Sequence, residues 1–138
     1  MIDVVIDSGI FTRQRFGGIS RQFVEISHHL SCTGLYSNDI IAKYHFNKHL
    51  AEYNQKEPRK ISKSTYIARL PNTLRKYVEQ INLAYEDDMI KKLAPMIVHH
   101  TFYPERKRTP KPKVFITVND MIREKSEPDG LRAKLKLN

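Results

Sequence analysis

A chain of 138 residues is long enough for one domain with its own hydrophobic core and short for two. Hydrophobic residues make up 40% of it, which excludes a disordered or collagen-like chain, and the lone cysteine, Cys32, excludes an internal disulfide. The net charge of +9 predicts attraction to anions, but it does not distinguish phosphate groups, nucleic acid and the acidic face of a membrane.

The first predicted element is a buried strand followed by a glycine loop. Residues 2–7 alternate and concentrate β-branched side chains, which pack well on a pleated surface. Ser8-Gly9 then supplies a break, and residues 10–16 predict a polar and aromatic loop that ends in Gly17-Gly18. Because glycine adopts positive φ without a Cβ clash, we expect this pair to form the turn into the next element.

A helix and a second strand complete a β-α-β unit. From Ile19 to Leu30, apolar residues recur every three or four positions, and Gly34 follows as a natural terminator. Residues 39–44 predict the second strand. Because such a crossover joins parallel strands whose two faces are both covered, the predicted fold class is α/β, a Rossmann-like parallel sheet with flanking helices.

The second half of the chain continues with helices and strands. Residues 47–64 are polar, with a candidate short helix at 48–55, and we expect them to lie outside the core. Residues 74–93 predict one kinked helix or two consecutive helices with an apolar face. Residues 96–99 and 114–118 predict two further strands, joined by a loop rich in proline and lysine.

Three sets of polar residues follow predicted strands, at the edge where ligands of open parallel sheets gather. They are Arg13 to Gly18, His99 to Tyr103, and Asn119-Asp120. The glycine pair would let backbone N–H groups approach an anion, and the dipole of the following helix would add attraction for phosphate. The pair lacks the third glycine of the dinucleotide fingerprint and the lysine of a P-loop, and a plain tight turn is the alternative.

Other candidate groups favour surface roles. His45 and His49 have the i, i+4 spacing of metal ligands, but no carboxylate or cysteine completes a shell, so we expect no metal. Glu86-Asp87-Asp88 falls on the polar side of its predicted helix, which favours a solvated face over a catalytic pair. Ser20 has no histidine arranged around it in the sequence, so nucleophilic catalysis is unsupported.

Three segments of the chain match one known pattern in order and spacing. They are Gln14 to Phe23 with Glu25 beyond, Ile97 to Tyr103, and Thr117 to Ile122 with Glu124. Through them the chain resembles, along nearly its whole length, the amino-terminal domain of family 4 glycosyltransferases, which are retaining enzymes with the B-type fold. The most specific part of the match is the string Gly-Gly-Ile-Ser-Arg, residues 17–21.

The resemblance implies a role for each matching residue. Gly17 and Gly18 would lie under the donor diphosphate, and Asn119 and Asp120 would form the catalytic pair that faces the transferred sugar. The family has histidine where Asn119 stands, and asparagine takes no proton near neutral pH, so positioning would be the main contribution of the pair. The acceptor pocket or cleft lining would comprise Arg13, Gln14, Phe16, Ser20, Arg21, His99, Thr101 and Tyr103.

The resemblance also implies the reaction and its partners. The expected activity is transfer of a sugar from a nucleotide-sugar donor to a glycan or lipid-linked acceptor, with retention and with no cofactor or metal. In this family a second Rossmann-like domain holds the donor, and no part of the chain resembles that domain. We therefore expect residues 1–138 to be an acceptor-side domain, inactive until a C-terminal domain or a separate chain supplies donor binding.

Two other functions remain open. A non-catalytic module for nucleic acid or an anionic surface would rest on the net charge alone, and no basic stripe with interleaved aromatics supports a nucleic-acid partner. A degenerate relic of a transferase is the second, with Asn119 as mild support. The acidic start and the lack of a long apolar segment predict a cytoplasmic protein, with peripheral contact at the inner face of an anionic membrane as an option.

Overall fold

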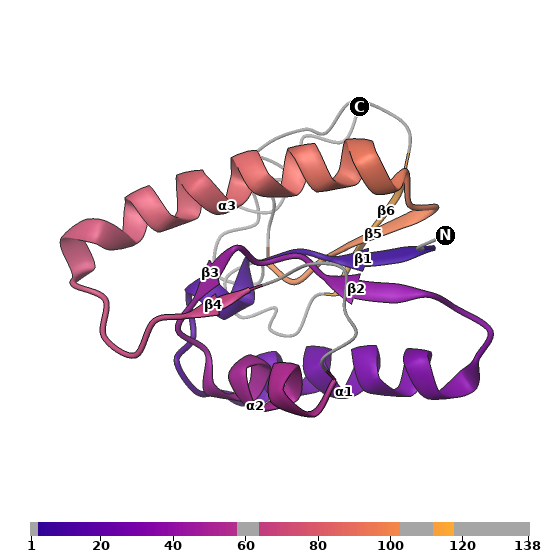
Figure 1. Cartoon of the computed structure of the whole chain (residues 1–138), viewed down its shortest axis with the longest axis horizontal. Coiled ribbons are helices and arrows are strands. Elements are labelled where there is room, and N and C mark those ends of the chain that lie inside the picture. Colours follow the sequence, from indigo (N-terminus) through magenta and orange to yellow (C-terminus); the bar gives the residue numbers. More distant parts are fainter. Residues whose placement is uncertain (1–2, 58–63, 103–111, 118–138) are drawn as a thin grey trace, which may run out of the picture.

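The computed structural model describes residues 3–57, 64–102 and 112–117. A parallel sheet forms the middle layer (Figure 1). Helices α1 (Gly18–Thr33) and α2 (Lys48–Lys56) cover one face, and α3 (Asn72–Leu93) crosses the other. The predicted α/β class, with parallel strands between helices in a Rossmann-like arrangement, is confirmed at this level.

The central sheet contains four strands in the order β2-β1-β5-β6, and all three pairings are parallel. Its register aligns Ile6 with both Ile40 and His99, and His100 with Ile116. The carboxyl ends of the strands therefore share one edge, where ligands of open parallel sheets bind. The strands are β1 (Val4–Ile6), β2 (Asn38–Ile40), β5 (Ile97–His100) and β6 (Lys113–Ile116).

The larger core cluster lies between the sheet and helices α1 and α2. Phe11 and Phe23 are its largest fully buried side chains. Phe11 belongs to η1 (Ile10–Thr12), a single 3₁₀ turn whose residues are all buried. The prediction of a polar loop was wrong for these three residues, because Ile10 and Phe11 enter the core directly after β1.

The glycines at the two ends of α1 differ in conformation. Gly34 ends the helix with a φ of 66°, the left-handed conformation that glycine favours. Gly17 precedes the helix with a φ of 178°, which is extended backbone that any residue adopts. Gly34 is the one glycine with positive φ in the described part of the chain, so the predicted positive φ at Gly17-Gly18 was wrong.

The predicted second strand divides into two strands of different sheets. Residues 38–40 form β2, whereas β3 (Tyr44–His45) pairs in parallel with β4 (Thr65–Tyr66). Asn82 of α3 explains the division. Its Oδ1 accepts a hydrogen bond from the Tyr44 N–H at 2.9 Å, and its Nδ2 donates to the Tyr44 carbonyl at 2.8 Å. Both backbone groups of Tyr44 are thereby satisfied away from the central sheet.

Helix α2 belongs to the core, contrary to the expectation for residues 47–64. Leu50 and Tyr53 are members of the core cluster beneath α1. The helix begins at an Asn47 cap, whose Oδ1 accepts from the Leu50 N–H at 3.0 Å. Asn47 Nδ2 also donates to the Gln14 carbonyl at 2.7 Å, which fixes the start of α2 to the loop after β1.

Helix α3 is one continuous helix of 22 residues. Its buried residues are Val78, Asn82, Glu86 and Met89. The apolar pattern predicts Leu74 and Ile81 on the buried face, but both are largely exposed. The buried face is rotated relative to the prediction because two polar side chains, Asn82 and Glu86, bind groups inside the protein.

Candidate functional site at the carboxyl edge of the sheet

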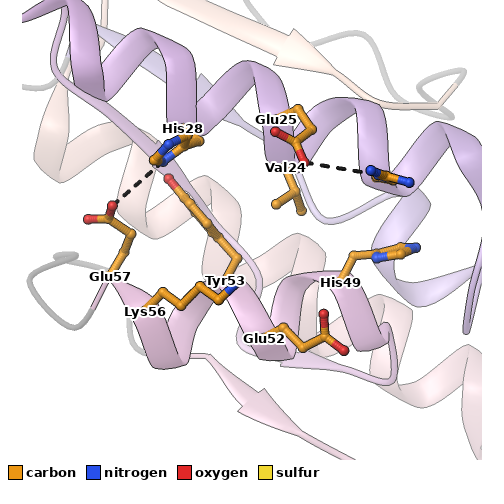
Figure 2. Close-up of a pocket in the computed structure, with 9 residues that line it drawn as sticks. Val24, Glu25, His28, His49, Glu52, Tyr53, Lys56 and Glu57 are labelled. Carbon is orange, nitrogen blue, oxygen red and sulfur yellow. Dashed lines mark ion pairs between the residues drawn. The ribbon is translucent and has the colours of Figure 1, made fainter.

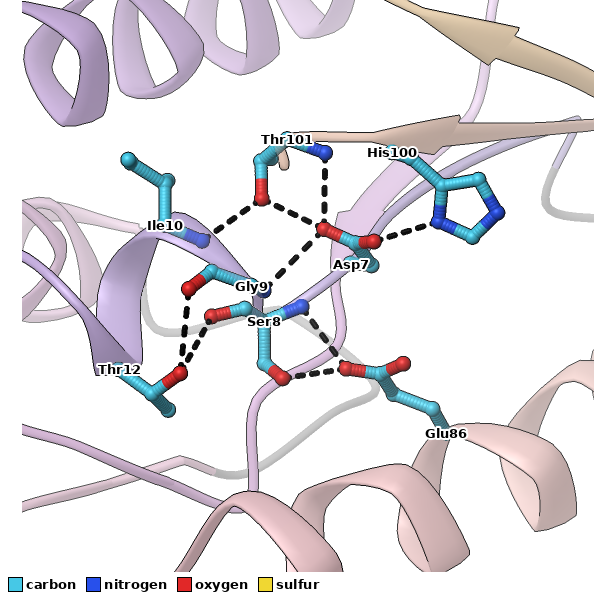
Figure 3. A network of polar contacts seen from close by, with 8 residues as sticks. All are labelled: Asp7, Ser8, Gly9, Ile10, Thr12, Glu86, His100 and Thr101. Carbon is cyan, nitrogen blue, oxygen red and sulfur yellow. Dashed lines mark hydrogen bonds and ion pairs between the residues drawn. The ribbon is translucent and has the colours of Figure 1, made fainter. Parts of the chain in front are cut away.

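Asp7 is the centre of a buried polar network where β1 ends (Figure 3). Its Oδ1 accepts hydrogen bonds from the Thr101 N–H at 2.9 Å, the Thr101 hydroxyl at 2.6 Å and the Gly9 N–H at 3.2 Å. Its Oδ2 lies 2.5 Å from His100 Nδ1. The Thr101 Oγ1 also accepts from the Ile10 N–H at 2.8 Å. A single carboxylate thus fixes the turn after β1 to the turn after β5.

The Asp7 carboxyl is ionised at neutral pH. Its burial would by itself raise the pKa, but the hydrogen bond and charge of His100 and the hydrogen bonds from Thr101 outweigh it and lower the pKa below 3.8. Because His100 is only 3% exposed, the Asp7–His100 pair is closed from solvent. The role of this pair is structural: it holds the end of β1 against the end of β5.

Glu86 of α3 binds the residue that follows Asp7. Its Oε1 accepts hydrogen bonds from the Ser8 N–H, at 2.9 Å, and from the Ser8 hydroxyl. Glu86 is 2% exposed, so the prediction of a solvated acidic face was wrong for this residue. The cause is that α3 crosses the end of β1 and supplies the acceptor for the Ser8 N–H. The prediction holds for Asp88, which is exposed and pairs with Lys92.

Gly9 allows the two turns to approach each other. A Cβ built at this position would lie 3.2 Å from Phe102 Cβ and from Thr101 Oγ1, and 3.4 Å from Asp7 Oδ1. Thr101 and Asp7 are held by the hydrogen bonds between them. A side chain at position 9 would therefore press against this network and against Phe102.

His99 lies on the opposite face of β5, beneath α1. Its ring meets the Phe23 ring edge-on, with centroids 5.0 Å apart, and its Nε2 lies 2.7 Å from Thr117 Oγ1, just after β6. Burial lowers its pKa, an effect that Asp7 opposes and His100 reinforces. His99 is therefore uncharged at neutral pH and serves as a hydrogen-bonding group at the edge of the sheet.

Helix α1 begins at this edge without a side-chain cap. Its N-cap residue is Gly17, which has no side chain to bind the first N–H groups of the helix. A Cβ at Gly18 would meet no atom of the described residues within 4 Å. A Cβ at Gly17 would come within 2.5 Å of Gln14 Oε1, which is the movable end of a side chain. Open space therefore adjoins the backbone at Gly18.

Three of the predicted lining residues are exposed. The Arg13 guanidinium carbon lies 4.4 Å from the centre of the Phe102 ring. Phe16 is 69% exposed, and its ring centroid lies 4.5 Å from that of His49. Arg21 is exposed on the second turn of α1. The structure brings these cationic and aromatic groups to the outer side of the loop and helix that follow β1.

The other predicted residues lie deeper. Ser20 is buried and donates from its hydroxyl to the Gly17 carbonyl at 3.0 Å, and Thr101 is buried in the Asp7 network. Gln14 Oε1 is a buried acceptor without a hydrogen-bond partner among the described residues. Tyr103, Asn119 and Asp120 lie outside the described residues.

The candidate metal pair shows no metal-site geometry. His45 is buried, and burial lowers its pKa to about 4 although its bond to the Asn47 backbone raises it. His49 instead stacks with Phe16. Within residues 3–57, 64–102 and 112–117, no three histidine, cysteine or acidic side chains gather as metal ligands would. In the same ranges, no helix has the length and apolarity needed to span a membrane.

Comparison with known proteins adds no relative. No family model matches the chain, and searches of curated proteins and of solved structures also find no match. The fold and the edge therefore define the class: an α/β protein with a Rossmann-like parallel sheet whose carboxyl edge carries ordered polar groups.

Proposed function

We propose that this chain is the acceptor-side domain of a retaining glycosyltransferase with the B-type fold. In this proposal the start of α1 faces the diphosphate of a nucleotide-sugar, and the exposed residues after β1 face a glycan or lipid-linked acceptor. A second Rossmann-like domain would hold the nucleotide. The basis is the resemblance of residues 14–23, 97–103 and 117–122 to that family, together with the edge at which the described parts of these segments meet.

The observation that carries the proposal is the unoccupied space at Gly18. The residue has no positive φ, and no described residue lies where a Cβ would contact it, so the described part of the fold does not require glycine there. Close approach of a ligand to the backbone is the other physical reason for glycine. The uncapped start of a helix offers N–H groups and a positive dipole end, which suit a phosphate.

His99 supports the same assignment. It lies beneath α1 through its contact with Phe23, five residues after Gly18, and it is held by Thr117. An uncharged imidazole can donate or accept a hydrogen bond to a sugar hydroxyl. The edge thus combines anion-binding and hydroxyl-binding groups, which a nucleotide-sugar and its acceptor require. Positioning, rather than proton transfer, is the contribution we assign to these residues.

The test is a titration of the ¹⁵N-labelled 138-residue chain with UDP-glucose, GDP-mannose and pyrophosphate. We expect weak binding, with shifts concentrated at the amides of residues 17–21 and at His99. Gly18→Ala should weaken this binding at least tenfold, because the methyl group fills the space that the phosphate would occupy. The same variant should unfold at an unchanged or slightly higher temperature, since alanine is the better helix former.

Two results would contradict the proposal. One is the absence of shifts at the start of α1 with all three ligands, and the other is equal binding by the wild-type chain and Gly18→Ala. Tight binding of DNA or RNA that falls steeply with salt would favour the basic binding module instead. Adding a donor-binding domain in trans should yield transfer with retained anomeric configuration. If no transfer is detected in that assay although phosphate binding is intact, the result would favour a degenerate relic of a transferase.

A further inference from the structure

A cavity lies in a groove between α1 and α2 (Figure 2). Its volume is about 480 Å³, which falls within the range of sites for small molecules. Helix α1 contributes Arg21, Glu25 and His28 to the walls, and α2 contributes His49, Glu52 and Lys56.

The floor of the groove is fixed in place. Val24 and Tyr53 line it, and both are buried members of the core cluster. The Tyr53 hydroxyl lies 3.0 Å from the Ser27 Oγ, which also donates to Asn38 Oδ1 at 2.7 Å. A ligand would therefore meet a preformed surface, which reduces the entropy lost on binding.

The charge of the groove differs from that of the whole chain. Three glutamates, Glu25, Glu52 and Glu57, face two permanent cations, Arg21 and Lys56, in a chain whose net charge is +9. With the histidines neutral the lining carries a net charge of −1. An anion such as a nucleotide is therefore disfavoured here, although the molecule as a whole attracts it.

The polar groups of the two walls are only partly paired. Glu25 lies 4.0 Å from Arg21 within α1, and Glu57 lies 3.7 Å from His28 across the groove. Glu52 and Lys56 of α2 have neither an ion pair nor a hydrogen bond among the described residues. Among the described residues, the groove thus presents an acceptor and a donor without an identified partner, one helical turn apart on α2.

We propose that the α1–α2 groove binds a neutral, polyhydroxylated ligand, a short oligosaccharide. A hydroxyl group both donates and accepts, so neighbouring hydroxyls on one sugar can satisfy Glu52 and Lys56 together, whereas a simple cation or anion satisfies only one of them. The choice of a glycan over other polyols rests on the proposed function. His49 lines the groove and its ring also contacts Phe16, one of the exposed residues after β1, so a glycan in the groove would extend towards the carboxyl edge.

The test is an amide-shift titration of the labelled chain with neutral trisaccharides (maltotriose, cellotriose and N,N′,N″-triacetylchitotriose), a trisaccharide of galacturonic acid, and trilysine. We expect at least one neutral trisaccharide to shift the amides of Glu25, Glu52 and Tyr53. The acidic trisaccharide and trilysine should bind at least tenfold more weakly. Glu52→Ala should weaken neutral binding at least fivefold. Gln55→Ala, an exposed change on the same helix outside the groove, should leave it unchanged.

The proposal is overturned if none of the neutral trisaccharides shifts groove amides at millimolar concentration, if trilysine binds better, or if Glu52→Ala and Gln55→Ala behave alike. Its failure is separable from that of the proposed function. If phosphate binds at Gly18 but no trisaccharide binds in the groove, only the proposal for the groove fails. Trisaccharide binding without any response to UDP-glucose, GDP-mannose or pyrophosphate removes the transferase assignment and leaves a glycan-binding protein.

Discussion

At the scale of single residues, Gly9 and Gly18 are glycines for opposite reasons. Gly9 has three neighbours within 3.4 Å of a would-be Cβ, whereas Gly18 has none within 4 Å. Gly9→Ala should therefore push the turn after β1 away from Thr101 and lower the free energy of unfolding by about 1–3 kcal/mol, as overpacking does. Urea unfolding of the two alanine variants side by side measures the contrast. Equal stability of the two would contradict this account of Gly9.

The sequence could predict where the glycine pair lies but not why the glycines are there. A strand, a loop and a helical period place Gly17-Gly18 at the start of α1, as the structure has it. Glycine's general freedom favours positive φ at such a place, yet the observed φ of Gly17 is extended. The empty space at Gly18 depends on residues far away in the sequence, and local patterns carry no information about it. The same holds for Thr101, which the pattern places at the edge but not inside the Asp7 network.

At the scale of elements, one carboxylate joins α3 to the central strand. Glu86 is the acceptor for both the N–H and the hydroxyl of Ser8. Glu86→Ala leaves two buried donors without that acceptor, so we expect a loss of about 2–4 kcal/mol in the free energy of unfolding. Asp88→Ala, two residues on, removes only an exposed i, i+4 ion pair and should cost about 0.5 kcal/mol or less.

Hydrogen exchange provides a second readout for this link. The Ser8 amide should exchange faster in Glu86→Ala than in Asp88→Ala, because only the former loses its acceptor. If the Ser8 amide exchanges at the same rate in Glu86→Ala and Asp88→Ala, α3 does not anchor the end of β1 through Glu86.

The sequence pattern missed this contact because it counts apolar residues. Val78 and Met89 give the correct face of α3, but the pattern places Glu86 towards solvent and gives no signal for Asn82. Asn82 also explains the division of the predicted second strand, because its two hydrogen bonds to the Tyr44 backbone keep β3 apart from β2. Asn82 and Glu86 lie four positions apart on the same side of the helix as Val78 and Met89. Two polar residues spaced in this way within an apolar face are the signal that could have indicated the buried contacts of Asn82 and Glu86. Their partners, Ser8 and Tyr44, become evident only from the tertiary structure.

At the scale of the whole molecule, stability should depend on pH in two separate windows. Asp7 has a lowered pKa, so its contribution is present above its unfolded-state pKa of 3.8 and is lost as the pH falls below that value. His45 acts at higher pH. It is uncharged in the fold, where its pKa is about 4, but it takes up a proton near pH 6.5 when the chain unfolds. Acidification from pH 7 therefore favours the unfolded state through His45 before Asp7 responds.

This ordering predicts a specific acid response. Between pH 7 and pH 4.5 the wild-type chain should lose about 2 kcal/mol of unfolding free energy through His45, with a smaller addition from His99, whose pKa is also lowered. His45→Gln removes the titrating group from its buried position. The unfolding free energy of this variant should therefore change less than that of the wild-type chain between pH 7 and pH 4.5, whatever its value at pH 7. His29→Gln, an exposed change on α1, should retain the wild-type slope. Urea unfolding at half-unit pH steps gives the three slopes, and a His45→Gln slope equal to the wild-type slope would show that this buried imidazole does not set the acid sensitivity of the fold.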